Sequence, residues 1–161
     1  MPMEFSGPEL MEMAVQTEKG GRLFYETVAA QTDDDRLREL FRFLADEETR
    51  HIAVFQDFAR SLRERPEELA YNWEEAVPYL RAVTDSRYFL GEAKALALAR
   101  ESASAEDALV HAIGFEKETL LFYNEMLTLV SEPSKPAVRR LVAEEKSHVV
   151  KLSLLRDALL K

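Results

Sequence analysis

The feature that most constrains the fold is an internal repeat, in which two segments from the first third of the chain recur near its end. Glu18-Lys-Gly-Gly-Arg-Leu-Phe-Tyr25 matches Glu116-Lys-Glu-Thr-Leu-Leu-Phe-Tyr123 at an offset of 98 residues. Leu44-Ala-Asp-Glu-Glu-Thr-Arg-His51 matches Leu141-Val-Ala-Glu-Glu-Lys-Ser-His148 at an offset of 97. A unit that holds both segments and occurs twice predicts two related halves packed against each other.

Each half is predicted to be a helical hairpin, because apolar side chains recur at steps of three or four residues, the spacing of one helix face. We expect long helices over residues 7–31, 34–64, 105–131 and 135–160. Ser6, Asp33 and Ser104 are the candidate N-caps of the first three, and Pro136 stands in the first turn of the fourth. Residues 66–103 are less regular and should form a crossover with two shorter helices, near 74–84 and 91–101.

The predicted fold class is therefore all-α: an antiparallel four-helix bundle of two duplicated hairpins, with a long, partly helical crossover between helices two and three. A length of 161 residues favours a single domain over residues 1–161. A content of 47% hydrophobic and 32% charged residues with only 5 Gly is typical of a helical protein in water.

The net charge of -9 argues against nucleic acid and anionic membrane surfaces as partners. The chain has no cysteine, which excludes disulfides, zinc-thiolate sites, iron–sulfur clusters and thiol nucleophiles. No apolar run reaches the ~18 residues of a membrane helix, and the N-terminus lacks the basic region of a secretory signal. We therefore expect a cytoplasmic protein.

Polar residues interrupt the apolar stripes at matched places. Glu48-x-x-His51 and Glu145-x-x-His148 lie on the stripes of helices two and four, and a carboxylate and an imidazole three residues apart share one helix face. Glu18 and Glu116 stand on the stripes of helices one and three. Four carboxylates and two imidazoles are thus predicted to converge inside the bundle.

Four bare carboxylates in a core would be very costly, and some would have to take up protons. Two divalent cations would balance them, and mixed oxygen and imidazole ligands suit Fe, with Mn as the alternative. A single Glu-x-x-His is more often a solvated pair or a core histidine with satisfied hydrogen bonds. The other interpretation of the set as a whole is a decayed duplication whose polar groups form a buried hydrogen-bond network.

Several neighbours of the six residues have two interpretations each. Tyr25 and Tyr123 follow Glu18 and Glu116 by seven residues and are either plain core residues or hydrogen-bond donors to a ligand carboxylate. Glu47 and Glu144 are either solvated or in contact with the ligands. His111 lies off the face of Glu116, and we expect no role for it in the site.

This pattern resembles the ferritin-like superfamily, and its rubrerythrin-like branch in particular. The resemblance implies a di-iron carboxylate site with the metal ligands Glu18, Glu48, His51, Glu116, Glu145 and His148. Together with the internal symmetry, it implies that His51 and His148 bind one ion each, that Glu48 and Glu145 bridge the ions, and that Glu18 and Glu116 cap one ion each. Tyr25 also fits rubrerythrin. Ferritin-like bundles commonly dimerise, so a homodimer is expected.

The resemblance implies an oxidoreductase that reduces hydrogen peroxide or dioxygen. Rubrerythrins proper carry a rubredoxin domain with four cysteines, which this chain lacks, so the electrons are expected from an external donor protein. Rubrerythrins also have an extra glutamate at the position of Thr119, whose repeat mate is Gly21. The six-ligand set is closer to bacterioferritin, although Thr49 stands where that family has its haem-binding methionine. The alternatives are a ferroxidase or iron-handling protein, a non-catalytic metal-binding bundle, and a hydroxylase of an organic substrate.

Overall fold

A computed structural model describes residues 7–65, 73–89 and 91–161 and confirms the all-α fold class. Six helices lie in these residues, at the following bounds: α1 Gly7–Gln31, α2 Asp35–Glu64, α3 Trp73–Thr84, α4 Glu92–Glu101, α5 Ala105–Leu129 and α6 Lys135–Leu159. The four long helices agree with the predicted ranges to within two residues at each end, and both crossover helices are present. The candidate cap Ser6 lies outside the described residues.

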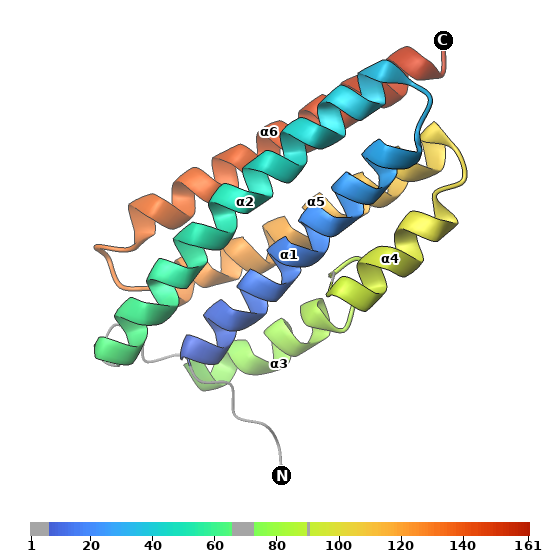
Figure 1. Cartoon of the computed structure of the whole chain (residues 1–161). Coiled ribbons are helices and arrows are strands. Elements are labelled where there is room, and N and C mark those ends of the chain that lie inside the picture. The colour runs from blue at the N-terminus through green and yellow to red at the C-terminus, as the bar shows by residue number, and fades with distance from the viewer. Residues whose placement is uncertain (1–6, 66–72, 90) are drawn as a thin grey trace.

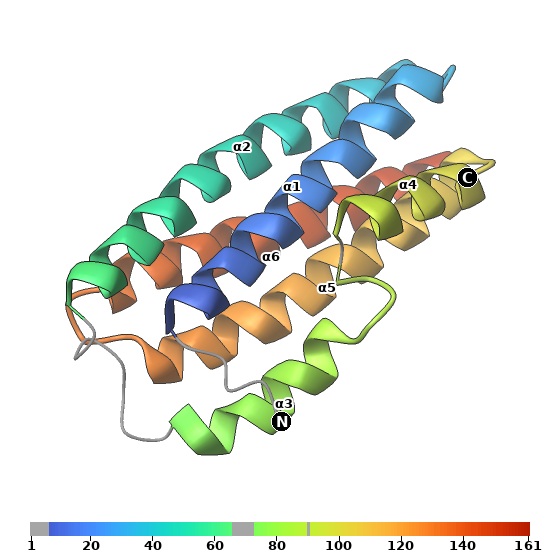
Figure 2. The same cartoon turned by 60° about the horizontal axis from the view of Figure 1, so that its bottom comes forward.

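The long helices α1, α2, α5 and α6 form the bundle, and each runs antiparallel to its neighbours (Figure 1). The helices α1 and α2 make one hairpin, and α5 and α6 make the other. In the crossover, α3 packs against α5 and α4 packs against α1 (Figure 2). The crossover therefore returns the chain along the bundle, so that α5 begins at the end where α2 begins. None of the helices in the described ranges combines the length and apolarity needed to cross a bilayer.

The N-cap of α2 is Asp34, so the prediction of Asp33 is wrong by one residue. The Asp34 carboxylate accepts hydrogen bonds from the backbone N–H groups of Arg36 at 2.9 Å and Leu37 at 3.1 Å. These are the second and third residues after the cap, which is the reach of an aspartate side chain with an extended backbone. The prediction for α5 is confirmed, since the Ser104 hydroxyl accepts from the Asp107 N–H at 3.0 Å.

The apolar core is divided into two clusters by a polar layer at the middle of the bundle. One cluster joins the first half of α1 to the second halves of α2 and α5, and includes Leu10, Phe55 and Phe122. The other joins the second half of α1 to the first halves of α2 and α5, and includes Phe24 and Phe41. The predicted stripe residues thus face inward, and the polar residues among them lie between two dry regions.

Gly21 permits a close contact between α1 and α5. A Cβ atom at this position would lie only 2.4 Å from Cζ of Phe115, whose ring covers the glycine. Phe115 is 1% exposed, and the centroid of its ring lies 6.1 Å from the centroid of the Tyr25 ring. The glycine weakens α1 locally but admits an aromatic ring beside the polar layer.

We expect Gly21→Ala to destabilise the protein by about 1–3 kcal/mol, although alanine favours a helix by about 1 kcal/mol over glycine. The reason is the clash with Phe115, which urea denaturation can isolate in a double-mutant cycle with Phe115→Leu. In the Phe115→Leu background the alanine should cost little or stabilise. A cost that is the same in both backgrounds would refute this explanation.

Candidate metal centre

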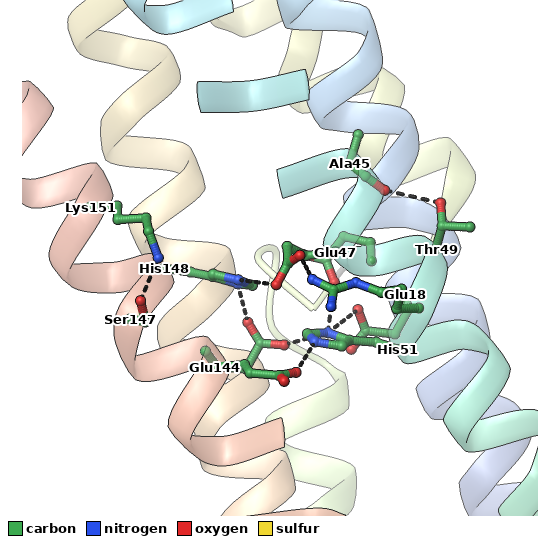
Figure 3. A network of polar contacts seen from close by, with 12 residues as sticks. Glu18, Ala45, Glu47, Thr49, His51, Glu144, Ser147, His148 and Lys151 are labelled. Carbon is green, nitrogen blue, oxygen red and sulfur yellow. Dashed lines mark hydrogen bonds and ion pairs between the residues drawn. The ribbon is translucent and has the colours of Figure 1, made fainter. Parts of the chain in front are cut away.

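The six predicted ligands lie together in the polar layer, and the bundle buries all of them. Glu18, Glu48, Glu116 and Glu145 are 0% exposed, and both histidines are 1% exposed. They come from four different helices: Glu18 from α1, Glu48 and His51 from α2, Glu116 from α5, and Glu145 and His148 from α6. Figure 3 shows Glu18 and His51 facing His148 across the bundle interior.

The six side chains form two overlapping groups of candidate ligands. One group contains Glu18, Glu48, His51 and Glu145, and the other contains Glu48, Glu116, Glu145 and His148. Within each group, one ligand atom from every residue lies within 4.8 Å of the others. Glu48 and Glu145 belong to both groups, which is the arrangement expected of two ions that share two carboxylates.

The hydrogen bonding of the carboxylates also fits cations. Both oxygens of Glu18 and one oxygen each of Glu48 and Glu116 are buried without a hydrogen-bond partner. Buried, unpartnered carboxylate oxygens are costly. Oxygen atoms aimed at a common centre with no donors are what a divalent cation needs, so the residues fit a pair of such ions.

The two imidazoles are oriented by a contact that crosses between the hairpins. Nδ1 of His51 lies 2.8 Å from Oε1 of Glu145, inside the cluster, while its Nε2 lies 3.0 Å from Oε2 of Glu144. Likewise Nδ1 of His148 lies 2.8 Å from Oε2 of Glu145, and its Nε2 lies 3.7 Å from Oε2 of Glu47. Both outer nitrogens are drawn with these contacts in Figure 3.

Glu47 and Glu144 therefore contact the candidate ligands rather than standing free in solvent. If Glu144 holds a proton on Nε2 of His51, loss of the second proton to an entering cation would leave Nδ1 able to bind that cation. Sequence reasoning left this role open. The signal for it was that a second glutamate precedes the candidate bridging glutamate in both halves of the repeat.

The two tyrosines of the repeat behave differently. The Tyr25 hydroxyl donates a hydrogen bond to Oε1 of Glu116, so it is a donor to a candidate ligand. The Tyr123 hydroxyl is buried and has no hydrogen-bond partner. His111 stands apart from the cluster, with its Nδ1 at 2.9 Å from the Ser102 hydroxyl, as its position off the face of Glu116 predicts.

Burial and mutual repulsion decide the charges of the metal-free cluster. Burial, with repulsion by Glu145, raises the pKa of Glu116 to about 8. Burial lowers the pKa of His148, but Glu116 and Glu145 outweigh it and raise this pKa to about 10. Burial and the neighbouring Glu18 raise the pKa of Glu48 well above its ordinary value. The metal-free cluster thus holds protons, which entering cations would displace.

The fold and these residues define a ferritin-like bundle of the di-metal carboxylate class. A solved structure from Thermotoga maritima, described as a ferritin-like diiron-carboxylate protein, aligns with a TM-score of 0.69 at 20% identity over 96% of this chain and 96% of that one. This likeness confirms the predicted ferritin-like fold. The rubrerythrin family model matches residues 9–156. The chain therefore belongs to the rubrerythrin family, as its sequence pattern predicts. No match was found among curated proteins.

We expect the free energy of unfolding of the metal-free protein to fall as the pH rises from about 5 to about 10. In the folded protein the pKa of Glu116 is about 8, against an ordinary value of 4.5. The pKa of His148 is about 10, against an ordinary value of 6.5. Because the folded state binds more protons, this stabilisation is complete below the unfolded pKa and is lost as the pH rises through the folded one.

Urea titrations of chelator-treated protein at a series of pH values measure this dependence. Glu116→Gln has no titrating group at position 116. In this variant the free energy of unfolding should fall less steeply between about pH 5 and pH 8. Stability that increases with pH over this range in the metal-free protein would show that the assigned protonation states are wrong.

Proposed function

We propose that this chain is a di-iron oxidoreductase that reduces hydrogen peroxide or dioxygen with electrons from an external donor protein. The observation that carries the proposal is the pair of overlapping ligand groups, which share Glu48 and Glu145. Glu18 and His51 would hold one ion, and Glu116 and His148 would hold the other. Iron is the metal proposed for both positions, with manganese as the alternative.

Reduction of hydrogen peroxide to water takes two electrons from the donor, and reduction of dioxygen to water takes four. Hydrogen peroxide, two protons and two electrons give two molecules of water. The bound ions would supply the redox capacity and Lewis acidity at the centre. The chain has no cysteine with which to hold a rubredoxin-type iron of its own, so the electrons are assigned to a separate donor protein.

The side chains around the centre would position and insulate it. Glu144 fixes the ring of His51 through the contact at 3.0 Å, and Glu47 faces the corresponding nitrogen of His148. The Tyr25 hydroxyl holds one oxygen of Glu116, which orients the other, unpartnered oxygen. The apolar clusters on both sides exclude bulk water, so that charges inside act over a low dielectric.

One observation favours a ferroxidase or iron-handling function as the second candidate. Thr119 is 0% exposed and occupies the position at which rubrerythrins carry their extra glutamate. The centre therefore has a hydroxyl in place of another carboxylate. The remaining six-residue set resembles that of iron-oxidising bundles, in which Fe²⁺ is the substrate.

We expect the purified protein to bind about two Fe or Mn ions per chain after anaerobic loading. His148→Ala and Glu116→Ala should each lose one or both ions, because each removes a ligand from a buried group. His111→Ala is the matched control, since this histidine lies outside the cluster, and it should retain two. Elemental analysis measures the metal content of each protein. A metal content near zero after anaerobic loading would refute the proposed centre.

Mixing the Fe²⁺-loaded protein with peroxide and, separately, with dioxygen should show whether the substrate is an oxidant or Fe²⁺ itself. Faster oxidation by peroxide, with repeated turnover when an electron donor is added, supports the reductase. Oxidation of many Fe²⁺ ions per chain, with iron retained as mineral, supports the ferroxidase instead. Absence of reaction with either oxidant contradicts both and leaves a non-catalytic metal-binding bundle.

A further inference from the structure

The two halves of the repeat differ at two positions beside the metal centre. Thr17 on α1 corresponds to Phe115 on α5, and Gly21 on α1 corresponds to Thr119 on α5. In one half, the Phe115 ring covers Gly21 and packs against Tyr25. In the other half, the small side chains of Thr17 and Thr119 occupy the equivalent places, and both are buried. One side of the centre is therefore filled by an aromatic ring that the other side lacks.

Unpartnered hydroxyl groups gather on the side that lacks the ring. The Thr119 and Tyr123 hydroxyls are buried without a hydrogen-bond partner. Helical threonines usually bond back to their own helix, as Thr27 does to the Leu23 carbonyl at 2.6 Å and Thr49 to the Ala45 carbonyl at 3.0 Å. Thr119 does not. It follows Glu116 by three residues and so shares the inward face of α5.

A surface cavity of about 470 Å³ reaches the same side from outside. It lies between α1 and the connection from α3 to α4, and its lining includes Gln16, Thr17, Phe89 and Gly91. The equivalent surface of α5 is covered, because the Tyr88 ring of this connection lies over Gly114, where a Cβ would meet it at 2.9 Å. Figures 1 and 2 show α3 and α4 beside α5 and α1 respectively. The crossover thus closes one side of the pseudo-symmetric bundle and leaves a hollow on the other.

We propose that a small oxidant such as hydrogen peroxide enters from this cavity past Thr17, and that the Thr119 hydroxyl holds it beside the metal pair. This inference rests on the proposed function. A hydroxyl is both donor and acceptor, which suits a molecule with O–H groups and lone pairs. A buried hydroxyl without a protein partner is a common place for a water or a small polar ligand. Thr119 would contact the oxidant but transfer no electrons, because the redox step needs only the ions and the donor.

The role of Thr119 is tested with azide, a small anion that accepts hydrogen bonds, titrated spectroscopically into the iron-loaded protein. Thr119→Val keeps the shape and removes the hydroxyl, so azide affinity should fall about 3- to 10-fold, as for one neutral hydrogen bond. Thr119→Ser should stay within about 2-fold, because it retains the donor. Thr27→Val is the matched control, since its hydroxyl bonds to Leu23, and it should not change the affinity.

An unchanged azide affinity in Thr119→Val, or an equal loss in Thr27→Val, overturns the role of Thr119. Iron content is measured in every variant. If Thr119→Val and Thr119→Ala both lose iron, Thr119 supports the ligands themselves and the proposed contact with the oxidant is wrong.

The route past Thr17 is tested by replacing Thr17 with phenylalanine, the residue found at the matching position 115 of the repeat. Thr17→Phe should slow azide binding in stopped-flow by 10-fold or more at unchanged iron content. Thr17→Leu, which fills less of the space, should slow it less, and it serves as the test if the larger residue prevents folding. An unchanged binding rate in the folded variant overturns the route. Azide binding needs no turnover, so a protein that passes these tests but reduces no peroxide refutes the proposed function alone.

Discussion

Everything in this structure depends on keeping four carboxylates and two imidazoles in a layer that is closed to water. Each of the four glutamates is fully buried, and burial alone favours their neutral forms. The rest of the bundle makes that layer tolerable. Two apolar clusters hold the helices on either side of it, so the polar groups cannot move apart to reach solvent. Protons balance the charge in the metal-free cluster, and two divalent cations would balance it in the loaded one.

The ligand set is symmetric, but its surroundings are not, and the crossover is the physical reason. Two equivalent hairpins give two equivalent sets of ligands. The crossover occurs only once in the chain, so it packs differently against α1 and against α5. The Tyr88 ring of the connection lies over Gly114 on α5, and the Phe115 ring nearby fills the gap above Gly21. On α1 the equivalent residues are Gln16 and Thr17, which line a hollow instead. Duplication thus supplies the metal centre, and the connection determines how it is approached.

Much of the fold could be predicted because it depends on periodicity and repetition, which the sequence displays directly. Stripes at helical spacing give the helices, and the repeat gives their pairing and the six inward polar residues. Contacts between hairpins are harder to predict, since they depend on how far each helix is rotated about its axis. That is why the contact between Glu144 and His51 was left open, although glutamates at both 47 and 144 hinted at it. The cap of α2 was missed for a local reason, because three consecutive aspartates offer the same chemistry and only backbone geometry selects Asp34.

The choice between oxidant and iron as substrate depends on the surroundings rather than on the six ligands, which fit both. Four carboxylates would balance two divalent ions, and a bound iron pair that supplies electrons would carry extra positive charge that these carboxylates do not balance. At Thr119 the chain has a hydroxyl in place of a further carboxylate, so the balancing negative charge would come from a small anion that enters from outside. The unpartnered hydroxyls of Thr119 and Tyr123 are hydrogen-bond donors able to stabilise such an anion. An anion derived from a reduced oxidant would meet this requirement under either proposed function, because an iron-oxidising protein also reduces an oxidant, so the hydroxyls of the open side are the groups through which both would hold it.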